Sequence, residues 1–166
     1  MESAAGKLKR YRALMQRGGD RRTRDDIAKY GCTVMHVMEQ GELPPFAYSV
    51  GVSQETGAPE IVVIGLKQPL AHSIVNEYNH RVRSGERFEG GKSYSGFIEG
   101  FEVFVEEVAM SAYDDYFGQA IDFYGGRDFK VVQIIYPTTK GVWPWAENAP
   151  KSFQDRQPIL AKVGRA

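Results

Sequence analysis

The sequence is poor in cysteine, in excess charge of either sign and in long apolar runs. Cys32 is its one cysteine, so no internal disulfide can form, and we expect a protein of the reducing cytoplasm. The formal net charge is +0, which argues against general nucleic-acid binding and is compatible with a homodimer. No apolar run resembles a signal peptide or reaches the length of a membrane span, so we expect no membrane association.

Several common signatures of chemistry are also missing. The chain has no Cys-x-x-Cys and no His-Glu-x-x-His pattern, and His72 and His80 are too far apart to form a ligand pair on one helix. Ser49 lacks the glycines of a nucleophile elbow. The stretch Gly90–Ser93 lacks the upstream glycine of a phosphate-binding loop and is better interpreted as a hairpin loop. We therefore expect no metal site and no cofactor.

What is present predicts an α+β fold. The chain is organised around Glu42–Val52, where a proline pair leads into a strand with alternating large and small residues. Glu60–Leu66 is a continuous apolar run, typical of a strand covered on both faces at the centre of a sheet. Further strands are expected over residues 32–38, 95–98, 101–108 and 129–136. The pattern predicts a single domain with a mostly antiparallel, curled sheet of about six strands and two main helices packed on it.

The first main helix is expected to start near Pro69, which suits a first helical turn, and to end at Gly85. Its apolar stripe consists of Leu70, Ile74, Val75, Tyr78 and Val82. The second should run from Ser111 to about Tyr124. A short helix is expected over residues 24–30, with Thr23 as its N-cap.

The N-terminal residues 1–24 form a separate basic segment. Their lysines and arginines alternate with Leu8, Tyr11 and Met15 at helical spacing, which predicts an amphipathic helix with a basic face over residues 1–19. Two interpretations stay open: a surface helix or arm, and a docking segment for an anionic partner. The domain itself is expected to span residues 25–166.

Candidate ligand-binding residues come from three places. A polar stripe on the first main helix, with His72, Asn76 and Asn79, follows a central strand, where ligands are often bound. The two indoles of Trp143 and Trp145 offer stacking surfaces. The alternative is structural, with His72 capping its helix and the tryptophans closing the open end of the sheet. Together with two strand residues, the predicted ligand-binding set is Tyr48, His72, Asn76, Gln133, Trp143 and Trp145.

Several stretches together resemble a bacterial family known as domain of unknown function 4262. The resemblance extends in order from Asp26 to Leu160 and leaves the basic segment outside. Its matching pieces are Pro44–Gly51, Gly57–Val63, Leu70–His72, Gly85–Phe88, Tyr94–Gly100, Val132–Pro137, Trp143–Trp145 and Gln157–Leu160. The name of the family assigns no activity, so the resemblance implies no catalytic role for any residue.

Two functions follow as hypotheses. The first is a cytosolic binding module without catalysis, which binds a protein partner or a small ligand, for example as an immunity or anti-defence protein. The alternative is a small hydrolase or transferase in which His72 acts as acid and base and Tyr48 or Glu60 assists. An exposed His72 without a neighbouring carboxylate would count against the enzyme.

Overall fold

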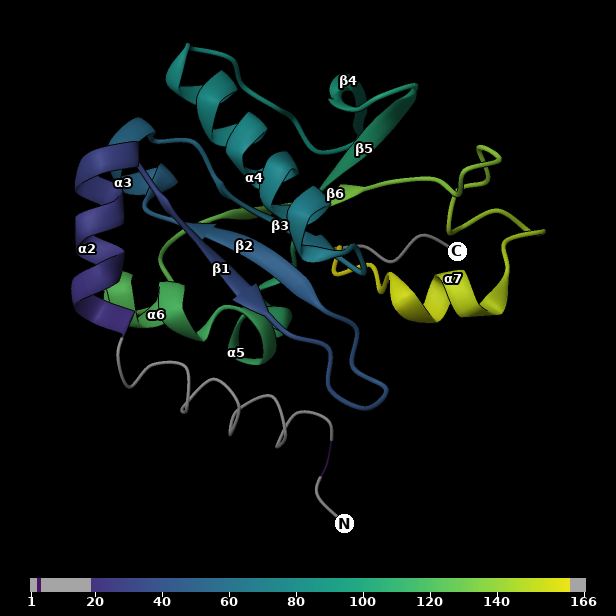
Figure 1. Cartoon of the computed structure of the whole chain (residues 1–166), viewed down its shortest axis with the longest axis horizontal. Helices are drawn as coiled ribbons and strands as arrows, with labels where there is room; N and C mark the ends of the chain where they lie inside the picture. Colours follow the sequence, from purple (N-terminus) through teal and green to yellow (C-terminus); the bar gives the residue numbers. More distant parts are fainter. Residues whose placement is uncertain (1–2, 4–18, 162–166) are drawn as a thin grey trace.

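The computed structural model describes residues 3 and 19–161, and its centre is one six-stranded sheet (Figure 1). The strand order is β1-β2-β3-β6-β5-β4, and all neighbours are antiparallel except β3 and β6. The strands are β1 (Thr33–Val37), β2 (Phe46–Val50), β3 (Glu60–Ile64), β4 (Lys92–Ile98), β5 (Phe101–Glu107) and β6 (Val131–Ile135). The predicted α+β fold is confirmed, with a mixed and open sheet.

Helices cover both faces and one edge of this sheet (Figure 1). They are α2 (Gly19–Tyr30), α3 (Val52–Thr56), α4 (Gln68–Arg83), α5 (Tyr113–Tyr116), α6 (Gly118–Tyr124) and α7 (Lys151–Arg156), with a 3-10 turn over Met110–Ala112. No helix in the part of the chain that the structure describes is long and apolar enough to cross a membrane.

The sheet separates two apolar cores. On one face, α4 packs Ile74, Val75 and Tyr78 against side chains such as Ile61. On the other face, α5 and α6 pack against the strand residues of opposite parity, such as Tyr48 and Val62. Because successive side chains of a strand point to opposite faces, β3 contributes to both cores, which explains its continuous apolar run. The central position predicted for this strand is confirmed.

Two helices differ from their predicted form. The helix expected over residues 24–30 begins earlier, at Gly19, so Thr23 is a buried residue inside α2 and not its cap. The helix expected from Ser111 to Tyr124 breaks at Phe117, which leaves helical geometry at φ −119° and ψ 40°. Phe117 is fully buried against the rings of Tyr48 and Tyr113, so tertiary packing overrides the local helical pattern there.

The packed stripe of α4 does not include Leu70. Leu70 was expected in the apolar stripe of α4, but it is 40% exposed because it lies in the first turn, beyond the edge of the packed stripe.

The helix predicted over residues 1–19 falls almost wholly outside the described residues. α2 also runs continuously across position 24, where the basic segment was expected to end.

Candidate functional site

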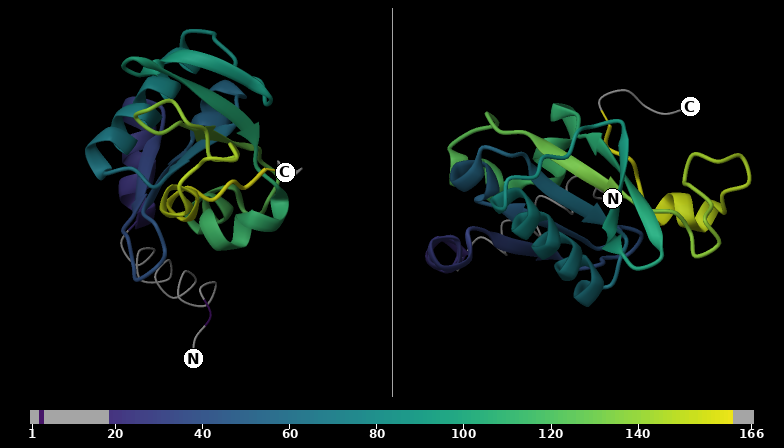
Figure 2. Two further views of the ribbon diagram at one scale, coloured as in Figure 1. Left: turned by 90° about the vertical axis from the view of Figure 1, so that its right-hand side faces the viewer. Right: turned by 90° about the horizontal axis from the view of Figure 1, so that it is seen from above.

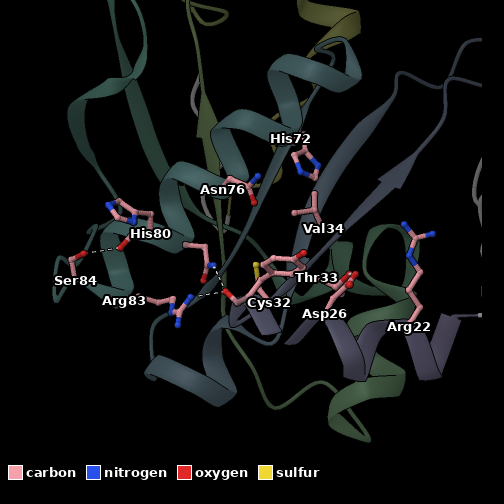
Figure 3. Close-up of a pocket in the computed structure, with 12 residues that line it drawn as sticks. Arg22, Asp26, Cys32, Thr33, Val34, His72, Asn76, His80, Arg83 and Ser84 are labelled. Carbon is pink, nitrogen blue, oxygen red and sulfur yellow. Dashed lines mark hydrogen bonds between the residues drawn. The ribbon is translucent and has the colours of Figure 1, made fainter. Parts of the chain in front are cut away.

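A polar groove of about 740 Å³ lies between α2 and α4, with β1 as its floor (Figure 3). Its lining residues come from all three elements and from the turns beside them: Arg22, Asp26, Tyr30, Cys32, Thr33, Val34, His72, Asn76, Asn79, His80, Arg83 and Ser84. Since β1 is an edge strand, nothing of the sheet lies beyond it, and the two helices form the walls. Three other cavities among the described residues are smaller, at about 450, 380 and 430 Å³.

Helical spacing explains the two walls. Arg22, Asp26 and Tyr30 follow one another at intervals of four residues on α2, and residues at this spacing share one face of a helix. His72, Asn76 and the residues after them do the same on α4. The opposite face of α4 is buried in the core, so its polar face is left for the groove.

A tight turn at Gly31 brings the walls together. Gly31 has φ +87°, a conformation that favours glycine, and it reverses the chain between α2 and β1. A Cβ atom at this position would lie 3.0 Å from Nε of Arg83. The absence of a side chain therefore lets the end of α4 approach the end of α2.

The last carbonyl of α2 joins the two helices. The Tyr30 carbonyl accepts hydrogen bonds from Asn79 Nδ2 at 3.1 Å and from Arg83 Nη1 at 2.7 Å. The other end of the Asn79 amide is different. Its Oδ1 has no hydrogen-bond partner, although Asn79 is only 7% exposed and lines the groove. An unsatisfied buried acceptor destabilises a fold by about 1–3 kcal/mol, so this oxygen calls for an explanation.

The charges of the groove are incompletely paired. Asp26 Oδ2 accepts a hydrogen bond from the Thr33 hydroxyl at 2.9 Å. Arg22 and Arg83 form no ion pair with any described residue, even though Arg22 precedes Asp26 by one helical turn. In Figure 3 the two arginines lie toward opposite ends of the groove. Two guanidinium groups are thus available to a ligand.

His72 lies at the upper end of the groove, bonded to another imidazole. His36 Nε2 and His72 Nδ1 are 2.9 Å apart, and the rings are nearly parallel, at 16°. Burial, and secondarily the neighbouring His72, lower the pKa of His36. His72 itself is exposed, and the described residues give it no carboxylate partner. The exposure of His72 and the absence of a carboxylate partner among the described residues both count against an enzyme that uses His72 as acid and base.

Cys32 is a packed thiol of the first core. It is buried, and burial raises its pKa to about 12. Since the thiolate is the nucleophilic form, this cysteine is protonated and unreactive at neutral pH.

Tyr48 and Gln133 are buried in the sheet, away from the groove. The Tyr48 hydroxyl accepts a hydrogen bond from the backbone amide of Gln119, and its ring lies in the core opposite α4. Gln133 is fully buried and binds the C-terminal segment, donating to the Pro158 carbonyl and accepting from the Leu160 amide, both at 2.8 Å. Tyr48 and Gln133 thus form hydrogen bonds that connect segments inside the protein.

Trp143 and Trp145 lie in the loop before α7, at the end of the molecule opposite α2 (Figure 2). Their rings stack on each other at 5.2 Å with an interplanar angle of 2°, and Phe104 meets both edge-on. Of the six predicted ligand-binding residues, only His72 and Asn76 line the groove, and the two tryptophans meet each other elsewhere.

Glu60 belongs to a second polar site, on the far side of β2. It is 1% exposed and accepts hydrogen bonds from five groups: the Ser49 and Tyr124 hydroxyls and the backbone amides of Gly51, Val52 and Ser53. Burial raises the pKa of Glu60, and these donors oppose that rise. The carboxylate anchors the start of α3, and none of these five hydrogen bonds is with His72.

Four charged or amide residues of the groove were not in the predicted ligand-binding set, although Asn79 was expected on the polar stripe of the first main helix. Asn79 and Arg83 continue the polar face of α4 that begins at His72, and this periodicity was the available signal. Arg22 and Asp26 gave no comparable signal, because nothing local indicates that α2 lies beside β1. No group of three or more side chains suited to hold a metal ion occurs among residues 19–161.

Comparison with known proteins identifies a family for this chain but gives no information on its activity. No curated protein and no solved structure shows a significant match. The profile of DUF4262, described as a domain of unknown function, matches residues 26–150, a range that contains β1 and all of α4. Since this range covers most of the sequence, the chain belongs to the DUF4262 family.

Proposed function

We propose that this domain is a binding module that holds a small polar ligand with at least one anionic group in the groove between α2, β1 and α4. A volume of about 740 Å³ lies within the range of small-molecule sites. The lining is more polar than that of most such sites, which favours a charged ligand over an apolar one.

The observation that carries the proposal is the set of unpaired groups in one place. Arg22 and Arg83 have no acidic partner in the described chain, and the Asn79 Oδ1 atom has no donor. Elsewhere the buried polar groups are mostly satisfied, as at Glu60 and Gln133. An anion would bind the guanidinium groups with charge-assisted hydrogen bonds.

Binding is favoured over catalysis by the chemistry of the side chains present. The Cys32 thiol is protonated, and His72 is exposed and bonded to His36. Neither forms a nucleophile–base pair with another residue of the groove. A concave, polar site also favours a small ligand over a protein partner, which would require a larger and flatter surface.

Native mass spectrometry of the protein purified from its own host tests the proposal. We expect extra mass in the native spectrum that is lost on denaturation. The substitution Asn76→Ala should reduce that mass, because Asn76 is an exposed groove residue whose loss leaves the core intact. Arg21→Ala, an exposed α2 residue outside the groove, is the matched control and should retain it.

The opposite result is equally specific. The proposal is wrong if the native spectrum shows only the bare chain or its multiples, and if a small-molecule extract of the host shifts no amide resonance of the groove.

A further inference from the structure

We infer that the ligand of this groove is elongated and carries two anionic groups, one bound at the Arg22 end and one at the Arg83 end. This inference rests on the proposed function and specifies its ligand class. It depends on where the two arginines lie, on what lies between them and on the absence of acidic partners for either.

The spacing of the arginines requires a long ligand. Arg83 is bonded to the carbonyl of Tyr30, which is the last residue of α2, whereas Arg22 lies near its start. The eight residue steps from Arg22 to Tyr30 correspond to about 12 Å along a helix axis. With the two arginines toward opposite ends of the groove (Figure 3), a ligand that binds both as they lie must be longer than one phosphate or carboxylate.

The surroundings differ between the two ends. Toward the start of α4, the helix presents the exposed side chains of His72 and Asn76 to the groove. Toward the end of α4, where Arg83 lies, it presents His80 and Ser84, and the Ser84 hydroxyl donates to the His80 carbonyl at 3.0 Å. Both ends of the α4 wall are therefore polar and exposed.

The middle of the groove is suited to a neutral linker. Val34 and Cys32 contribute apolar surface to its floor, and the ring of Tyr30 is 54% exposed at its side. Asp26 is the one acidic residue of the lining. It disfavours a further anionic group in the middle and leaves the two ends as the places for negative charge.

A ladder of dicarboxylates measures this spacing directly. Succinate, adipate, suberate and sebacate would be titrated into the ¹⁵N-labelled full chain, with octanoate as the monoanionic equivalent of suberate and inorganic phosphate as a compact anion. We expect the affinity to increase along the ladder, and suberate to bind about tenfold more tightly than octanoate, as one additional charge-assisted hydrogen bond implies.

Three variants connect this length dependence to the arginines. Arg22→Gln should make suberate bind as weakly as octanoate. Arg83→Gln should do the same while it keeps a donor for the Tyr30 carbonyl, so the fold is preserved. Arg21→Gln, on the exposed surface of α2 outside the groove, should leave the ladder unchanged.

The outcomes separate the two claims. If succinate, suberate and octanoate shift the groove resonances with equal affinity, the groove binds a single anion; the two-ended inference is then wrong and the proposed function stands. If only phosphate binds, the inference is again wrong. If no probe binds and the native spectrum also shows the bare chain, the proposed function fails as well.

Discussion

The groove and the Glu60 site are both polar clusters beside strands of the sheet, but their hydrogen bonding is opposite. At Glu60, five donors converge on one buried carboxylate, which joins β2, β3 and α3. In the groove, two arginines have no ion pair and one buried amide oxygen has no partner. The side chains of the groove are also more exposed.

This difference distinguishes two uses of polar residues. A fully satisfied buried network stabilises and positions the chain, and removing one member leaves the others without partners. A cluster with open hydrogen-bonding capacity contributes little to stability and is available to a ligand. The comparison therefore predicts large stability effects at Glu60 and small ones in the groove.

Glu60→Ala should have the largest effect. It removes the acceptor of five hydrogen bonds and leaves buried donors unpaired, so we expect a loss of roughly 3–4 kcal/mol in the free energy of unfolding. Urea denaturation followed by circular dichroism measures it. Glu55→Ala, an exposed change in α3, is the control and should stay within about 0.5 kcal/mol. If Glu60→Ala lowers the free energy of unfolding by less than about 1 kcal/mol, the predicted difference in stability effects between the Glu60 site and the groove is wrong.

Glu60→Gln sharpens the same point through pH. The pKa of Glu60 is raised in the folded state by burial, so its contribution to stability is fully present below the ordinary value of 4.5 and is lost as pH rises through the folded pKa. Glutamine does not titrate. We expect Glu60→Gln to cost about 2 kcal/mol at pH 4 and less at pH 8. A cost that grows with pH would show that the donors, and not burial, dominate.

Asn79→Ala should have a moderate effect. The change removes one hydrogen bond, from Nδ2 to the Tyr30 carbonyl, but it also removes the unpaired Oδ1. Since Arg83 still donates to that carbonyl, we expect a loss of about 1 kcal/mol in the free energy of unfolding. Thermal and urea unfolding would both report it. A loss as large as that of Glu60→Ala would mean that Asn79 is a structural residue.

The His36–His72 pair should give the smallest effect. Burial and His72 lower the pKa of His36, so its contribution to stability is present above the ordinary value of 6.5 and is lost as pH falls through the folded pKa. In an NMR titration His36 should titrate below 6.5. His72→Ala should move its pKa upward, while His80→Ala, which does not contact His36, should not. An unchanged His36 in His72→Ala would show that burial alone causes the shift.

Local patterns in the sequence were sufficient for much of the fold. The apolar run of β3 indicated a strand buried on both faces, and the proline near the start of α4 with its apolar stripe placed that helix within a few residues. The strands predicted over residues 95–98 and 101–108 belong to the antiparallel pair β4 and β5. Each of these signals depends on neighbours in sequence, which is why a single sequence reveals them.

Only part of the candidate site could be predicted from local patterns in the sequence. His72 and Asn76 were found because they share one face of a helix. Tyr48 and Gln133 were selected as polar groups within apolar strands, but their strands are central and their side chains are bonded inside the protein. The tryptophans were correctly read as neighbours, and their loop lies at the other end of the molecule.

The sequence by itself determined the fold class, the main strands and helices, the family and the polar face of α4, because periodicity and turn chemistry act over a few residues. Only the tertiary structure decided that β1 is the edge strand, that α2 lies beside it and that Arg22 and Arg83 flank one groove. These facts depend on strand order and on contacts between segments some fifty residues apart, such as Tyr30 with Asn79 and Arg83. Packing over the whole sheet selects such contacts, and no local pattern encodes them.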